Sequence, residues 1–140
     1  MARICLSLVA LDGSTTALNE ARRRLGVNSN VRFVNATVPE QMPRGPFDLI
    51  VMSEIAYYLP QHKLATLGRK AIAALAPHGL IVLLHHRRAF EDAAQLPGLA
   101  HQRFHRQLNK TLRMTFAVAY PRFDAATFKK LSPRRTRTVN

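Results

Sequence analysis

The sequence predicts an α/β fold with a doubly wound, mostly parallel sheet that ends in an antiparallel strand pair. Short apolar runs alternate with segments of helical periodicity, in the order strand, helix, strand, connector, strand, helix, strand. This alternation is typical of parallel strands joined by right-handed crossovers. Several of the apolar runs are continuous rather than alternating, which favours strands buried on both faces of a sheet.

The first part of the chain carries one strand–helix–strand unit. Residues 4–11 form a continuous apolar run that predicts a buried strand. A helix follows, with Ser14 or Thr15 as its N-cap and Gly26 as its C-cap. Residues 31–34 alternate between apolar and polar side chains, and they predict a second strand.

The second part repeats the pattern and then changes. Residues 47–52 and 80–84 predict two buried strands around a helix at 64–75, which should stop at a Pro77–Gly79 turn. Residues 89–110 predict a helical excursion. The remaining expectations are an antiparallel pair at 112–119 and 123–128, a domain spanning 1–128 and a basic, disordered tail at 129–140.

The composition is that of a globular, reduced protein. Of the 140 residues, 47% are hydrophobic, but no apolar run approaches the roughly 18 residues that a membrane span needs. Cys5 is the only cysteine, so an internal disulfide is excluded and a cytoplasmic setting is expected. We therefore expect no membrane partner.

The net charge of +13 raises the question of an anionic partner. The basic residues are spread over several segments, and no aromatic side chains interleave with them as a base-stacking surface requires. Solvated faces and a loose basic tail are therefore favoured over a specific nucleic-acid site. A basic nucleic-acid-binding module is kept as a less favoured alternative.

Polar residues gather at the ends of the predicted strands. Ligands of doubly wound sheets bind at the carboxyl ends of strands. Asp12 ends the first strand, where a carboxylate can accept both hydroxyls of a ribose, although an acid there also stabilises a helix start. Residues 36–37, 53–54 and 85–86 follow the other three strands. We expect these four ends to share one edge of a single sheet.

Three blocks resemble the class I S-adenosylmethionine-dependent methyltransferases, which have a Rossmann-like fold. They are residues 9–14, residues 47–59, and residues 75–80 with their Leu-x-Pro-x-Gly turn. Residues 53–59 more narrowly resemble the NodS-like (nodulation protein S) subgroup, which N-methylates the glucosamine end of a chitin-type oligosaccharide. The resemblance covers residues 6–88 well and residues 89–130 loosely.

The resemblance implies S-adenosylmethionine as cofactor and a small-molecule or oligosaccharide acceptor. Asp12 would bind the ribose, with two small residues beside it, two residues would border the adenine, and one would lie under the methionine portion. The implied cofactor-binding residues are, in this order, Asp12 for the ribose, Gly13 and Ser14 beside it, Ala36 and Thr37 for the adenine, and Ser53 for the methionine portion.

The resemblance also implies that Tyr57, Tyr58, His85 and His86 face the acceptor. Glu54, Tyr58 or His85 could assist as a base, with Glu54 preferred, although it could also cap a turn. His101 and His105 have the i, i+4 spacing of a metal pair, but no third ligand is evident. We therefore expect no metal and place both on a solvated face.

The family's first strand and its glycine-rich loop have no counterpart, because only eleven residues precede Asp12. Without that strand its neighbours keep unpaired backbone groups, which predicts self-association through open sheet edges. The chain alone is expected to bind S-adenosylmethionine poorly and not to turn over. The alternatives left open are an enzyme fragment and a non-catalytic remnant or partner subunit.

Overall fold

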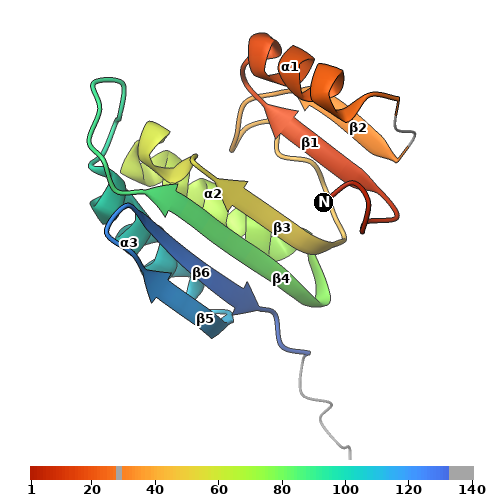
Figure 1. Cartoon of the computed structure of the whole chain (residues 1–140). Helices are drawn as coiled ribbons and strands as arrows, with labels where there is room; N and C mark the ends of the chain where they lie inside the picture. Colours follow the sequence, from red (N-terminus) through yellow and green to blue (C-terminus); the bar gives the residue numbers. More distant parts are fainter. Residues whose placement is uncertain (28–29, 133–140) are drawn as a thin grey trace, which may run out of the picture. The chain divides into compact units, whose positions relative to one another are not determined.

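The computed structural model describes residues 1–27 and 30–132, and the chain forms two compact units, residues 1–42 and 43–140 (Figure 1). The strands form two hydrogen-bonded sheets, of two and four strands, rather than the single sheet that we expected. The α/β class, the parallel crossovers and the closing antiparallel pair are as predicted.

The first unit is one strand–helix–strand crossover. Strands β1 (Leu8–Asp12) and β2 (Val31–Asn35) pair in parallel and are joined by α1 (Thr15–Leu25). The predicted caps are confirmed. The Ser14 hydroxyl accepts a hydrogen bond from the Ala17 N–H at 3.2 Å, and Gly26 has a φ of 68°, which favours glycine.

The start of the first strand was predicted wrongly. β1 begins at Leu8, and Ile4 and Leu6 are 84% and 101% exposed. Residues 1–4 form a turn instead, and the Asn30 side-chain amide donates to two carbonyl oxygens of residues 2–5 at 2.7 Å each. Three carbonyl oxygens of this segment are therefore paired without a ladder to a neighbouring strand.

The second unit is a four-stranded mixed sheet in the order β3-β4-β6-β5. β3 and β4 are parallel, and β6 pairs antiparallel with both β4 and β5. The strands are β3 (Phe47–Ser53), β4 (Leu75–His86), β5 (Arg113–Ala119) and β6 (Phe123–Lys129).

Two helices cover one face of this sheet (Figure 1). They are α2 (Gln61–Ala74) and α3 (Pro97–Leu108), and a short 3-10 helix, η1 (Ala56–Tyr58), follows β3. Every second residue from Gly79 to His85 in β4 and from Asp124 to Phe128 in β6 is buried, as the two-residue period of a strand requires. The core is formed by Leu64, Leu67, Ala71, Ile81, Leu83, Phe104, Leu108, Ala126 and Phe128.

Two predicted boundaries differ in this unit. The turn expected at 77–79 lies inside β4, because the strand already begins at Leu75 and bends at His78, whose φ is 63°. The tail was expected to start at residue 129, but Lys129 belongs to β6. Lys130 is also held, since its Nζ donates to the carbonyl oxygens of Ile72 and Leu75 at 3.1 and 2.8 Å. The predicted disorder of residues 133–140 lies outside the described residues.

Candidate functional site

Asp12 stands at the carboxyl end of β1 in the first unit. Its Oδ1 accepts a hydrogen bond from the Ser14 N–H at 2.7 Å, and the side chain is exposed. The Asn35 amide, at the end of β2, donates to the carbonyl oxygens of Asp12 and Gly13 at 3.2 and 3.0 Å. Among the described residues nothing hydrogen-bonds the second carboxylate oxygen of Asp12, which is therefore available to a hydroxyl donor.

The other predicted cofactor residues of this unit lie beside Asp12. A Cβ built on Gly13 would stand 3.8 Å from Thr37 Cγ2 and 3.9 Å from the Ala36 carbonyl oxygen. Thr37 is fixed by Gln41, whose Oε1 accepts from its N–H and its hydroxyl at 2.8 and 3.0 Å. The structure thus brings five predicted residues together at the carboxyl ends of β1 and β2. The exposed carboxylate of Asp12 among them suits a ribose diol.

A second polar cluster lies at the ends of β3 and β4 in the second unit. Glu54 Oε2 accepts hydrogen bonds from the Tyr57 hydroxyl and from His86 Nδ1, and its Oε1 accepts from the His86 N–H at 3.0 Å. Tyr57 is 1% exposed, whereas the side chain of His86 is 34% exposed. Glu54 reaches both partners from a left-handed backbone conformation, with a φ of 58°.

The hydrogen bonds decide the charge of this cluster. Burial raises the pKa of Glu54, but hydrogen bonds from Tyr57 and His86 outweigh it, so that the pKa lies below its usual 4.5. Burial and the neighbouring carboxylate raise the pKa of Tyr57 above its usual 10. Glu54 is therefore ionised at neutral pH, and Tyr57 remains a hydrogen-bond donor.

His85 points to the other side of β4 and is fully buried. Its Nε2 accepts from the Ala56 N–H at 3.1 Å, so its proton lies on Nδ1, which is 3.2 Å from Nδ1 of His101. Burial, followed by the neighbouring His101, lowers the pKa of His85 to about 4. Burial also lowers the pKa of His101. This neutral pair ties η1 to α3.

The prediction that His101 lies on a solvated face is wrong, because this residue is only 7% exposed. It lies on the buried face of α3 together with Pro97, Ala100, Phe104 and Leu108. The i, i+3, i+4, i+7 spacing of these apolar residues could have revealed this in the sequence. Among residues 1–27 and 30–132, no group of three potential ligands could hold a metal ion.

Among the described residues, two predicted site residues have no side-chain hydrogen bond to the Glu54 cluster. Tyr58 is 48% exposed, and its ring contacts those of Tyr57 and Phe90 at centroid distances of 4.8 and 5.4 Å. Ser53 is exposed and pairs with Leu84 in the strand ladder. Of the three predicted catalytic residues, only Glu54 therefore belongs to the cluster, and its partners are Tyr57 and His86.

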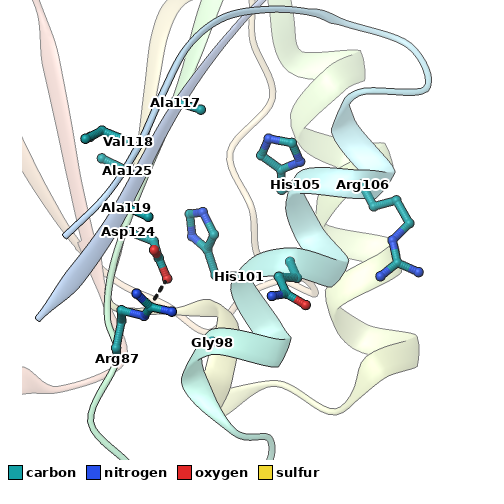
Figure 2. A pocket seen from close by; sticks show the side chains of 11 residues that line it. Arg87, Gly98, His101, His105, Arg106, Ala117, Val118, Ala119, Asp124 and Ala125 are labelled. Carbon is teal, nitrogen blue, oxygen red and sulfur yellow. Dashed lines mark ion pairs between the residues drawn. The ribbon is translucent and has the colours of Figure 1, made fainter. Parts of the chain in front are cut away.

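An open pocket of about 580 Å³ lies between α3 and the β5–β6 hairpin (Figure 2). Figure 2 shows His101, His105 and Asp124 facing it from opposite sides, with a wall of small residues, Ala117, Ala119 and Ala125. Arg87 Nε lies 3.5 Å from Asp124 Oδ2 at one end.

In the part of the chain that the structure describes, no helix is long and apolar enough to cross a membrane.

Residues 1–79 match the family model described as "Methyltransferase domain". The chain belongs to this family. It is 30% identical over 83 residues to two proteins named nodulation protein S, from Rhizobium fredii and Sinorhizobium fredii. The matched segment covers 59% of this chain but only 47% and 38% of those proteins, so the chain spans about half the length of its curated relatives or less.

Solved structures agree with this assignment. A protein from Pseudomonas syringae assigned as a methyltransferase is 34% identical, with a TM-score of 0.74 over 92% of this chain and 76% of that one. The N-methyltransferase NodS from Bradyrhizobium japonicum, solved with S-adenosyl-L-homocysteine, is 20% identical, with a TM-score of 0.78 over 94% and 70%. The Rossmann-like fold and the NodS-like resemblance are confirmed, and S-adenosylmethionine is the family's cofactor.

Proposed function

We propose that this chain carries part of an N-methyltransferase that transfers a methyl group from S-adenosylmethionine to the amine of an amino-sugar oligosaccharide. The sequence similarity to nodulation protein S and the NodS-like residues 53–59 support the choice of acceptor. The observation that carries the proposal is the Glu54–Tyr57–His86 cluster, because methylation of a neutral amine requires the loss of a proton.

The first unit supplies the contacts to the cofactor. Asp12 accepts hydrogen bonds from a ribose hydroxyl, since its second carboxylate oxygen is available. Gly13 and Ser14 are small residues that leave room for the cofactor beside Asp12. Ala36 and Thr37 border the adenine. When bound, the cofactor supplies an electrophilic methyl group on a sulfonium centre. Ser53, in the second unit, is proposed to lie near the methionine portion.

The second unit supplies the group that takes the proton. Glu54 is a weak base, because its lowered pKa disfavours protonation. The geometry instead favours His86. Its Nδ1 proton is held by the Glu54 carboxylate, which leaves the Nε2 lone pair to accept a proton from the amine. Glu54 then orients the imidazole and stabilises the imidazolium, and Tyr57 fixes Glu54 from its buried side.

His85 and Tyr58 keep more limited roles in this proposal. His85 holds the backbone of η1 at Ala56 and thereby positions Tyr57. Tyr58 is exposed beside Phe90, where it can contact the acceptor. Most of the rate acceleration in such a transfer comes from holding the amine in line with the methyl group.

The test uses this chain and a chimera in which the preceding segment of a nodulation protein S relative is fused to it. Titration with S-adenosyl-L-homocysteine and methyl transfer to a chitin-type oligosaccharide with a free terminal amine are measured. Asp12→Asn in the chimera should weaken cofactor binding about tenfold, because it removes a charge-assisted hydrogen bond. His86→Gln and Glu54→Gln should lower turnover while cofactor affinity stays the same.

Glu20→Gln is the matched control for Asp12→Asn. It removes the same charge from a partly exposed residue of the same unit, one that pairs with Arg23 and Arg24. Equal cofactor affinity of Asp12→Asn and the parent chimera would remove Asp12 from the site. Methylation of a hydroxyl but not of the amine would overturn the proposed acceptor.

A further inference from the structure

Helices α2 and α3 enclose a groove of about 320 Å³ in the second unit whose charged lining is entirely cationic. Four basic side chains line it, Arg69 from α2 and Arg103, Arg106 and Lys110 from α3 and the turn that follows. Neither Gln61–Ala74 nor Pro97–Leu108 contains an aspartate or a glutamate. The lining is completed by Gln61, Leu64, Ala65 and Gln107. Basic residues that look dispersed in the sequence are therefore gathered by the fold.

The arginines of this groove are oriented by neutral acceptors. Arg69 Nη2 donates to the Thr66 hydroxyl at 2.9 Å, and Arg103 Nη1 donates to Gln95 Oε1. An amide or hydroxyl oxygen fixes the direction of a guanidinium group without neutralising its charge. Figure 2 shows the Arg106 guanidinium group pointing away from His101 and Asp124, so that the acid of the neighbouring cavity does not pair with it.

The two helices approach closely at Gly68, beside the groove. A Cβ at this position would stand 2.4 Å from Gln107 Nε2, so a larger residue would displace the end of that side chain. Gln107 Nε2 donates to the Ala65 carbonyl oxygen at 2.7 Å and ties α3 to α2. This hydrogen bond links the two helices that carry the cations.

We propose that this groove binds a ligand with two or more linked phosphate groups, such as an inorganic di- or triphosphate or the phosphate chain of a nucleotide. Three guanidinium groups can bind phosphate oxygens in a bidentate manner, and the lysine adds a point charge. Four positive charges match the charge of a linked phosphate chain, whereas a single carboxylate leaves most of them unpaired. No aromatic side chain lines the groove, so it offers no stacking surface for the bases of a nucleic-acid strand.

The experiment is isothermal titration of the chain with sodium triphosphate at physiological salt, with inorganic phosphate and a single-stranded RNA oligonucleotide as separate arms. Arg69→Gln/Arg106→Gln is compared with Arg113→Gln/Arg122→Gln, which removes the same charge from exposed residues of the same unit. Circular dichroism verifies that both double variants are folded. We expect saturable 1:1 binding of triphosphate that the groove pair weakens at least about tenfold and the control pair changes less than about threefold.

Two results would overturn the proposal. Equal weakening by both double variants would show that triphosphate responds only to the net charge of the chain. Tighter binding of the RNA, with the same sensitivity at Arg113 and Arg122 as at Arg69 and Arg106, would assign the cations to a diffuse nucleic-acid surface.

Discussion

At the residue scale, the spacing of side chains explains why Tyr57 and His86 join Glu54 while Tyr58 and His85 do not. Glu54 precedes η1 and has a left-handed φ of 58°, and from there its carboxylate accepts hydrogen bonds from Tyr57 in η1 and from His86 at the end of β4. Consecutive residues of a strand face opposite sides, so His85 points with Ile81 and Leu83 into the core. The sequence identifies a Tyr–Tyr and a His–His pair, but their faces depend on which side of β4 the helices cover.

The buried His85 makes stability depend on pH. Its pKa of about 4 in the folded chain lies below the ordinary 6.5, so between these values the unfolded chain binds more protons than the folded one. The free energy of unfolding should therefore fall by about 1–2 kcal/mol from pH 7 to pH 5. Glu54 adds a loss only below its ordinary 4.5, outside this window.

Urea titrations followed by tyrosine fluorescence at several pH values measure this dependence. All three tyrosines lie in the second unit, so the signal reports that unit alone. His85→Gln should flatten the slope, with a smaller part remaining from His101, whose pKa is also lowered. An unchanged slope in this variant would show that His85 is not the group that titrates.

At the element scale, the sequence predicts the order and type of the elements better than their ends. Apolar runs and caps locate α1, α2 and the strands, because burial and capping are encoded locally. The bend at His78 that lets β4 begin at Leu75 depends on pairing with Phe47 in a distant strand. Likewise, the apolar pattern of residues 4–7 predicts a strand, but the Asn30 side-chain amide donates to the carbonyl oxygens of Ala2 and Cys5 instead. Such boundaries are set by tertiary contacts, which a local pattern does not contain.

Two glycines at element starts should respond in opposite ways to alanine. A Cβ on Gly45, just before β3, would stand 1.9 Å from the Ala74 carbonyl oxygen, and backbone cannot move as a side-chain end can. Gly45→Ala should therefore destabilise the second unit by about 1–3 kcal/mol. Gly98, in the first turn of α3, has nothing within 4 Å of its Cβ position, so Gly98→Ala should stabilise it by about 0.5–1 kcal/mol. Thermal unfolding of both variants measures this, and a stabilising Gly45→Ala would contradict the packing described.

At the scale of the whole molecule, the two units differ in how much core they contain. The buried residues among 1–27 and 30–42 are Leu18, Ala36 and Pro39, whereas the second unit buries both helices against alternate residues of β4 and β6. The sequence predicts one domain over 1–128, because both segments show the same strand–helix–strand pattern. How many side chains each segment buries depends on the number of strands that pair, and the pattern does not specify this.

This difference predicts unequal protection from hydrogen exchange. Within the described part of the first unit, one two-stranded ladder and α1 protect the amides of β1 and β2, and a small core stabilises them weakly. Amides of Ile81 and Leu83 lie in the centre of a four-stranded sheet beneath two helices. Exchange followed by mass spectrometry should be at least about tenfold faster in residues 8–12 and 31–35 than in residues 81–84, which corresponds to about 1.4 kcal/mol in opening free energy. Equal protection of both sets would show that the chain opens as one cooperative unit, and a stronger core than the three buried residues would then have to hold the first unit.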